Sequence, residues 1–172
     1  MTTLTTPARP RFRPWHAASI FLAANVLSAL PAGYGGDFAL YDDFRRPEVA
    51  PPDWLFAPMW LFLNVTSLMA LSRVANEPAL TRAHRRFFWL EGAGWVFFAA
   101  FSTLYFGLRS PVLGAADTAA GLLAGLASFA VVWKLNRRAA LLILPRVLWL
   151  ILATYVSVFV AANNADPFFG TR

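Results

Sequence analysis

Five long apolar runs, separated by short polar turns, constrain the fold of this chain more than any other feature. They cover residues 14–34, 54–75, 87–108, 112–133 and 139–163. Each run is close to the ~20 residues that a helix needs to cross the roughly 30 Å hydrocarbon core of a bilayer. The sequence therefore predicts an all-α polytopic membrane protein, in which a bundle of five transmembrane helices occupies residues 14–164. Residues 1–13 and 165–172 are predicted to be short tails.

The composition excludes several other classes of protein. With 58% hydrophobic and 14% charged residues, the chain is too apolar for an ordinary soluble domain. It has no cysteine, which excludes disulfides, thiolate catalysis and cysteine metal sites. The only histidines, His16 and His84, lie among arginines near predicted helix ends, where an interfacial position is favoured over metal binding. We therefore expect no metal and no required cofactor.

The basic residues are distributed unevenly about the predicted helices. Eleven lie toward the side of the N-terminus, namely Arg9, Arg11, Arg13, Arg73, Arg82, Arg85, Arg86, Lys134, Arg137, Arg138 and Arg146. Four lie toward the other side, namely Arg45, Arg46, Arg109 and Arg172. Because they are spread over loops rather than gathered on one face, nucleic-acid binding is not expected. We expect an integral protein of a bacterial inner (plasma) membrane, with the N-terminus cytoplasmic and the C-terminus outside.

The loop between the first two predicted helices is acidic. Residues 35–53 contain Asp37, Asp42, Asp43, Glu48 and Asp53, against only Arg45 and Arg46. This loop is longer than a simple helix connection needs, and such loops often act as lids or contact ligands. We expect it to lie outside, above an outward-facing cavity.

The stretch PPDWLFAPMWLFLN, residues 51–64, joins this loop to the second predicted helix. Its two leading prolines hold the backbone extended, which makes Asp53 the expected N-cap of a helix that begins at Trp54. Phe56, Trp60 and Leu63 follow helical spacing, so two aromatic rings share one face of this helix. An interfacial aromatic belt is the alternative explanation for each tryptophan.

Two further patterns concern contacts between helices. Gly121 and Gly125 form a GxxxG pair, which allows close approach of another helix, either within the bundle or across a dimer. Glu91 and Arg146 are ionisable residues within predicted spans, where such side chains are costly and normally face a partner or water. The two lie at similar predicted depths, so they are expected either to pair or to extend separately to the cytoplasmic interface.

Several motifs together resemble the tryptophan-rich sensory protein (TspO/translocator) family. PPDWLFAPMW resembles its PPxWxFxPxW signature, and ALLILPRVLWLILATY resembles its AALLxPYxxWxxxAT pattern, with Pro145, Trp149, Ala153 and Thr154 in register. LYFGLRSP is similar to the end of the family's third helix, and Asp117 falls where the family has an acidic residue at the start of its fourth. The resemblance covers about residues 14–164.

This resemblance implies a five-helix membrane bundle, often a homodimer, whose aromatic cavity binds a tetrapyrrole such as porphyrin or haem. Residue by residue, it implies ligand contacts from Trp54, Phe56, Trp60, Trp149 and Ala153, and the third helix adds Trp95 and Phe98 as candidates. This chain departs from the family pattern where a glutamine, an asparagine and a tryptophan are common, because it has Gly94, Phe98 and Phe101 there. We expect Trp54, Trp60 and Trp149 to line one cavity.

Three functions are compatible with this pattern. The first is a tetrapyrrole-binding sensor or carrier, the second a light-dependent porphyrin-degrading enzyme, and the third a membrane scaffold that has lost the ligand. The residues assemble no nucleophile with an adjacent base, no carboxylate pair and no metal constellation. Binding is therefore favoured over catalysis, with the lipid bilayer and a tetrapyrrole as the expected partners.

Overall fold

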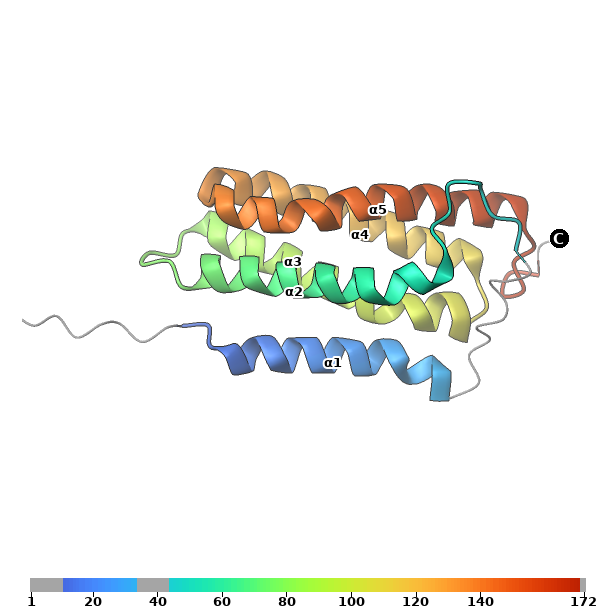
Figure 1. Ribbon diagram of the computed structural model, residues 1–172, viewed down its shortest axis with the longest axis horizontal. Coiled ribbons are helices and arrows are strands. Elements are labelled where there is room, and N and C mark those ends of the chain that lie inside the picture. The colour runs from blue at the N-terminus through green and yellow to red at the C-terminus, as the bar shows by residue number, and fades with distance from the viewer. Residues whose placement is uncertain (1–10, 34–43, 171–172) are drawn as a thin grey trace, which may run out of the picture.

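The computed structural model describes residues 11–33 and 44–170, and it is built around five long helices (Figure 1). They are α1 (Pro14–Gly33), α2 (Phe56–Ala75), α3 (Arg82–Ser102), α4 (Pro111–Leu135) and α5 (Arg137–Asn163). A 3₁₀ turn, η2 (Asp53–Leu55), precedes α2, and a π-helical turn, η3 (Thr103–Gly107), follows α3. The predicted all-α five-helix fold is confirmed. Residues 1–10, 34–43 and 171–172 lie outside the described part; they include most of the predicted N-terminal tail and Asp37, Asp42 and Asp43 of the acidic loop.

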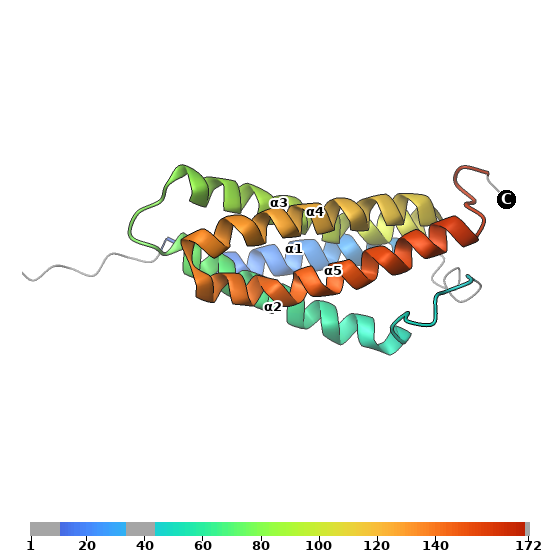
Figure 2. The same ribbon diagram turned by 90° about the horizontal axis from the view of Figure 1, so that it is seen from above.

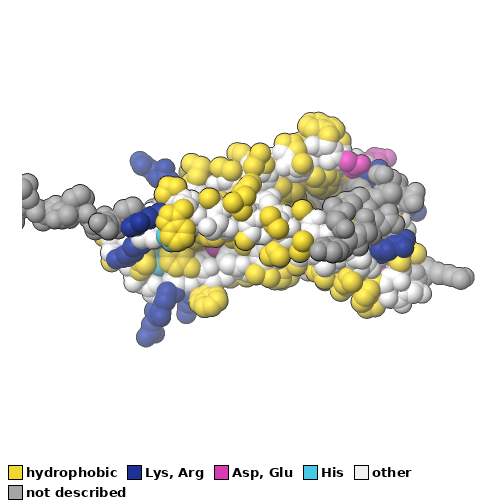
Figure 3. All heavy atoms as spheres, turned by 90° about the horizontal axis from the view of Figure 1, so that it is seen from below, with side chains coloured by type: hydrophobic (Ala, Val, Ile, Leu, Met, Phe, Trp, Pro, Cys, Tyr) yellow, Lys and Arg dark blue, Asp and Glu magenta, His cyan; other side chains and the backbone are white. Residues whose placement is uncertain are grey.

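Within the described residues, four segments are long and apolar enough to cross a membrane. They are Asp53–Ala75, Arg82–Gly107, Pro111–Leu135 and Arg137–Asn163, whereas the apolar stretch described in α1, Pro14–Leu30, is shorter. Lys and Arg side chains gather at the end of the molecule next to the N-terminal segment, and apolar side chains cover much of its length (Figure 3). We call this end, which holds residues 76–81 and the α4–α5 turn, the basic end, and the opposite end the loop end.

Each helix of the bundle packs chiefly against particular neighbours. α4 packs against both α3 and α5, α2 packs chiefly against α5, and α1 packs chiefly against α3 (Figures 1 and 2). The buried apolar cluster lies mainly in the half toward the basic end, with Leu71 and Val74 of α2, Phe87 of α3, Val132 of α4 and Ile143 of α5. The other half of the bundle is therefore the half that can hold a cavity.

The GxxxG pair of α4 faces other helices of the same chain. Both glycines are buried. A Cβ atom at Gly125 would lie 3.5 Å from Leu150 Cδ1 of α5, and one at Gly121 would lie 3.7 Å from Phe97 Cβ of α3. The small residues therefore allow close packing within the bundle, which is the first of the two alternatives drawn from the sequence.

Helix α3 begins at Arg82, five residues before the predicted start at residue 87. The Thr81 backbone N–H donates to His84 Nδ1 at 3.1 Å, so the side chain of His84 caps the helix from its first turn. Because Nδ1 accepts, His84 carries its proton on Nε2, which lies 2.7 Å from Glu77 Oε2. The sequence predicts that the arginines just before residue 87 lie in a loop, but in the structure they lie in the first turns of α3.

Glu77 joins three parts of the basic end. Besides His84, it accepts a hydrogen bond from Asn136 Nδ2 at 2.9 Å, at the turn between α4 and α5. Its backbone oxygen accepts from Arg11 Nη1 at 3.2 Å, which holds the N-terminal segment against the α2–α3 loop. Burial acts to raise the pKa of Glu77, but the hydrogen bonds from His84 and Asn136 bring it below its ordinary value.

Asp53 does not act as the predicted N-cap. Its carboxylate accepts from Arg46 Nη1 at 2.9 Å, and it makes no capping hydrogen bond to a helix. The chain instead enters α2 through η2, in which the Leu55 N–H donates to the Pro52 carbonyl at 2.9 Å. Helix α2 therefore starts at Phe56 rather than at Trp54.

Candidate functional site

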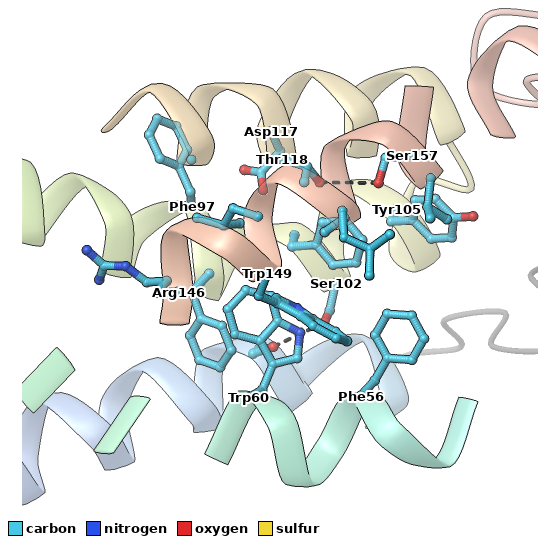
Figure 4. Close-up of a pocket in the computed structure, with 18 of the residues that line it drawn as sticks. Phe56, Trp60, Phe97, Ser102, Tyr105, Asp117, Thr118, Arg146, Trp149 and Ser157 are labelled. Atoms are coloured by element: carbon cyan, nitrogen blue, oxygen red, sulfur yellow. Dashed lines mark hydrogen bonds between the residues drawn. The ribbon is translucent and has the colours of Figure 1, made fainter. Parts of the chain in front are cut away.

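A cavity of about 520 Å³ occupies the half of the bundle toward the loop end (Figure 4). All five helices contribute to its wall, for example Ser28 of α1, Trp60 of α2, Phe98 of α3, Gly121 of α4 and Leu150 of α5. Pro51 and Asp53, from the segment that enters α2, line it at the loop end. Its size lies within the ~300–1,000 Å³ that small-molecule sites usually occupy.

The aromatic rings predicted from the sequence form much of this wall. Phe56 meets Trp149 edge to face, with ring centroids 5.7 Å apart, and Trp60 lies 5.2 Å from Phe98. Trp95 packs at right angles to Phe98, at 6.0 Å. Six of the seven candidate residues line the cavity, namely Phe56, Trp60, Trp95, Phe98, Trp149 and Ala153. Their part in binding a ligand remains a prediction.

Trp54 is the exception, and its expected place in the cavity is wrong. It lies in η2, is 72% exposed and is not among the residues that line the cavity. A 3₁₀ turn has about three residues per turn instead of 3.6, so Trp54 does not continue the face that Phe56 and Trp60 share on α2. Its position near the end of a span agrees with the interfacial alternative for this tryptophan.

A second group of aromatic residues was not among the candidates from the sequence. They are Phe97 and Phe101 of α3, with Tyr105 and Phe106 of η3, and all four line the cavity. Tyr105 stacks on Phe101 with ring centroids 5.3 Å apart. The π-helical turn shifts the register at the end of α3, so regular helical spacing does not place Tyr105 and Phe106 correctly. The aromatic content of LYFGLRSP was the available signal.

Glu91 and Arg146 form a buried ion pair at the end of the cavity nearer the basic end. Arg146 Nη1 donates to Glu91 Oε2 at 3.0 Å and to Ser67 Oγ at 3.1 Å, and Arg146 Nη2 donates to Glu91 Oε1. The hydroxyl of Ser128 also donates to Glu91 Oε1. Glu91 is 1% exposed and Arg146 7%, so neither extends to the interface. Of the two alternatives drawn from the sequence, pairing is the one observed, and the pair with its serine partners joins α2, α3, α4 and α5.

Several polar groups near the cavity are left without partners. Buried donors with no acceptor in the described part of the chain are Asn64 Nδ2, Trp95 Nε1, Arg146 Nε and Trp149 Nε1. All four residues line the cavity. Each of these atoms is enclosed by the surrounding side chains, so it reaches an acceptor in the cavity only after its own side chain turns.

The wall of the cavity formed by α4 and α5 carries a carboxyl group and two hydroxyl groups. Asp117, Thr118 and Ser157 lie on α4 and α5 across from Phe56 and Trp60 (Figure 4). Thr118 Oγ1 donates to the Gly114 carbonyl at 2.8 Å and lies 3.4 Å from Ser157 Oγ. The arrangement as a whole can bury and orient a flat aromatic molecule. Among the described residues that line it, no nucleophile has an adjacent general base.

Comparison with known proteins relates this geometry to one family. Residues 17–162 match the model of the TspO/MBR family, which is most of the chain and includes every helix that lines the cavity. The chain belongs to the TspO/MBR family. With four helices able to span a bilayer, this TspO/MBR chain is a membrane protein.

Individual relatives are similar over much of their length. The chain is 28% identical over 154 residues to the tryptophan-rich protein TspO of Archaeoglobus fulgidus, which covers 84% of this chain and 97% of that protein. It is 25% identical over 152 residues to the tryptophan-rich protein TspO of Chlorobaculum tepidum, with coverages of 85% and 89%. A translocator protein homolog of Schizosaccharomyces pombe is 30% identical over 122 residues, or 69% of this chain and 73% of that protein.

Proposed function

We propose that this protein binds a tetrapyrrole in the cavity between its five helices and acts as a sensor or carrier of that ligand in the membrane. The observation that carries the proposal is a cavity of about 520 Å³ walled by aromatic rings in a TspO/MBR chain. The rings of Phe56, Trp60, Phe98 and Trp149 come from three different helices and surround the same space.

The chemistry of the wall suits a flat macrocycle. Each buried aromatic side chain contributes ~150–250 Å² of apolar contact, and offset or edge-to-face ring geometries add about 0.5–1.5 kcal/mol per pair. The donors of Asn64, Trp95, Arg146 and Trp149 can supply hydrogen bonds for acceptor groups such as the carboxylates or carbonyls of a tetrapyrrole once these side chains turn toward the ligand. Binding by stacking, burial and a few polar contacts follows from these features.

The charge distribution supports an orientation for this site. Basic side chains gather at the basic end, so we infer that this end is cytoplasmic in a bacterial inner membrane and that the cavity opens toward the outer side (Figure 3). Arg146 lines the cavity and pairs with Glu91 at the end of the cavity nearer the basic end, where the apolar cluster is packed. A site that is closed toward the cytoplasm in this way favours ligand capture or sensing over a through-channel.

Titration of the purified protein with protoporphyrin, followed by quenching of tryptophan fluorescence, tests the proposal. Ala153 lines the cavity, whereas Ala162, nine residues later on α5, is exposed on the outside of the bundle. Ala153→Phe fills the cavity and is expected to weaken binding by about tenfold or more. Ala162→Phe adds the same side chain elsewhere and is expected to leave affinity unchanged.

The same titration separates the three candidate functions. Saturable quenching that Ala153→Phe weakens, with no change in the pigment, supports a sensor or carrier. New absorbing products under light would show a degrading enzyme instead. Absence of quenching, or equal quenching of all three proteins, would refute tetrapyrrole binding in this cavity.

A further inference from the structure

Asp117 is a buried carboxylate in the wall of the cavity, and it has no partner in the described part of the chain. It is 8% exposed and lies on α4, across the cavity from Trp60 (Figure 4). The hydroxyl of the neighbouring Thr118 takes part in two hydrogen bonds, but neither involves the Asp117 carboxylate. Ionisable side chains within membrane spans are costly and are normally paired or functional. No group of the described chain therefore satisfies the Asp117 side chain by a hydrogen bond or an ion pair.

The other charged residues that line the cavity are already compensated within the chain. Arg146 donates through both terminal nitrogens to Glu91, and Asp53 accepts from Arg46 at the loop end. Neither Arg146 nor Arg46 is bonded to Asp117. Among the described lining residues, Asp117 is thus the ionisable side chain that no group of the chain engages by a hydrogen bond or ion pair, which leaves it available to a ligand.

We propose that Asp117 accepts hydrogen bonds from N–H groups at the centre of a flat aromatic ligand, so that the cavity selects a metal-free tetrapyrrole over its metal complexes. This inference rests on the proposed function and specifies its ligand class. Two pyrrole nitrogens of a metal-free macrocycle carry N–H groups, and a bound metal replaces both. These N–H groups point toward the centre of the ring, so a carboxylate over the face of the ring accepts from them when the pyrrole rings tilt out of the plane, and such hydrogen bonds are strong in a low-dielectric site.

The residue types in the wall agree with this selection. The usual protein ligands of haem iron are histidine, cysteine, methionine and tyrosine. The described residues that line the cavity include no histidine, cysteine or methionine. Tyr105 is the lining residue of such a type, and its ring is 3% exposed and stacked on Phe101. The cavity wall therefore offers an acceptor for central N–H groups, Asp117, more readily than it offers a usual ligand for a central metal.

Matched titrations with protoporphyrin, its zinc complex and haemin test the proposal. Asp117→Leu removes the acceptor, and Asp117→Asn keeps an acceptor but removes the charge. Because a hydrogen bond to a charged group is strong, Asp117→Leu is expected to weaken protoporphyrin binding by about tenfold or more, and Asp117→Asn by less. Binding of both metal complexes is expected to stay unchanged. Glu48→Gln, which removes an exposed carboxylate outside the cavity, is the control.

Each other outcome overturns the proposal. If the Asp117 variants bind all three pigments equally more weakly than the wild type does, Asp117 shapes the cavity but does not accept hydrogen bonds from the central N–H groups. Weakening of the metal complexes alone would make the carboxylate a metal ligand. Unchanged binding of protoporphyrin in both Asp117 variants would show that the carboxylate does not contact it. Thermal melts of each variant establish that the proteins compared are folded.

A second probe separates this inference from tetrapyrrole binding itself. The probe is 9-aminoacridine, a flat aromatic cation that carries N–H donors but is no macrocycle. If the wild-type protein binds no pigment, yet binds 9-aminoacridine about tenfold more tightly than Asp117→Leu does, Asp117 accepts from a flat aromatic donor as proposed, but tetrapyrrole binding, and with it the selection among tetrapyrroles, fails. If the wild-type protein binds neither probe, both proposals fail.

Discussion

Glu91 of α3 and Arg146 of α5 meet at the same depth in the bundle, where two nitrogens of the guanidinium donate to the two oxygens of the carboxylate. Glu91 lies nine residues after the first residue of α3, and Arg146 lies nine residues after the first residue of α5. At 1.5 Å per residue, both lie roughly 14 Å into their helices. Arg146 also donates to Ser67 of α2, and Ser128 of α4 donates to Glu91. Hydrogen bonds to this ion pair therefore connect four helices.

Removal of one partner from this pair should cost more than removal of both. Arg146→Leu leaves the Glu91 carboxylate buried without a counter-charge, and such a change typically costs about 3–5 kcal/mol. The double change Glu91→Leu with Arg146→Leu removes both charges, so it is expected to be the more stable of the two proteins. Thermal or denaturant unfolding in detergent measures the difference.

The single change Glu91→Leu completes this double-mutant cycle. If the two residues interact, the sum of the two single effects should exceed the effect of the double change by about 1 kcal/mol or more. Simple additivity of the two single changes would refute an energetic role for the pair, whatever the geometry.

Gly114 of α4 gives a prediction about the wall of the cavity. A Cβ atom at this position would lie 2.3 Å from Tyr105 Cδ2, closer than any van der Waals contact. The ring of Tyr105 is buried and stacked on Phe101, so it cannot move without disturbing the wall. Gly114→Ala is therefore expected to destabilise the protein by about 1–3 kcal/mol.

Gly92 of α3 is the matched control for this prediction. It also lies within a helix, but a Cβ atom there would have no heavy atom within 4 Å. Gly92→Ala should be neutral or stabilising by up to about 1 kcal/mol, because alanine is the better helix former. Unfolding in detergent compares the two variants with the wild type. Equal effects of both changes would show that the contact with Tyr105 does not determine the cost at Gly114.

The five helices can be predicted from the sequence because each apolar run is long and the polar turns between them are short. Two parts of the cavity wall can be predicted from helical spacing. Phe56 and Trp60 are four residues apart on α2, and Trp149 and Ala153 are four residues apart on α5, so each pair shares one face of its helix. The Glu91–Arg146 pair can also be predicted from the sequence, because charged residues within spans are few and their depths can be compared. These features depend on regular helices alone.

The features that the sequence does not reveal depend on departures from regular helices or on single hydrogen bonds. Trp54 leaves the predicted face because the chain enters α2 through a 3₁₀ turn. Helix α3 starts early because His84 caps it, a role more often filled by glutamate or glutamine. Asp117 was recognisable as an acidic residue near a helix start, but only the packing of α4 shows that its carboxylate faces the cavity without a partner.

The absence of cysteine gives a direct test of the proposed orientation. Glu48→Cys places a single exposed thiol near the loop end, and Arg85→Cys places one at the basic end. A membrane-impermeant maleimide added to intact cells should label the Glu48→Cys protein and leave the Arg85→Cys protein unlabelled, because basic loops stay in the cytoplasm. Both should be labelled after the membrane is permeabilised, and the wild type in neither case. The reverse pattern in intact cells would invert the orientation.

The last prediction concerns Asp166, which ties the end of α5 to the start of α4. Its Oδ2 atom accepts from the Ser110 hydroxyl at 2.7 Å and from the Val112 N–H at 3.0 Å, and Oδ1 accepts from the Phe169 N–H at 3.0 Å. Burial acts to raise the pKa of Asp166, but these hydrogen bonds together bring it below its ordinary value of 3.8. The ionised form is therefore stabilised by folding.

The sign of the pH effect follows from this direction. Because the pKa of Asp166 is lower in the folded than in the unfolded protein, its contribution to stability is complete above the ordinary pKa and is lost as the pH falls through the folded value. Asp166→Asn should cost about 1–3 kcal/mol at pH 7, and the gap to wild type should shrink below about pH 4. Unfolding in detergent from pH 7 to pH 3 measures the gap, with Glu48→Gln as the exposed control. A gap that stays constant down to pH 3 would show that the ionisation of Asp166 does not support the fold.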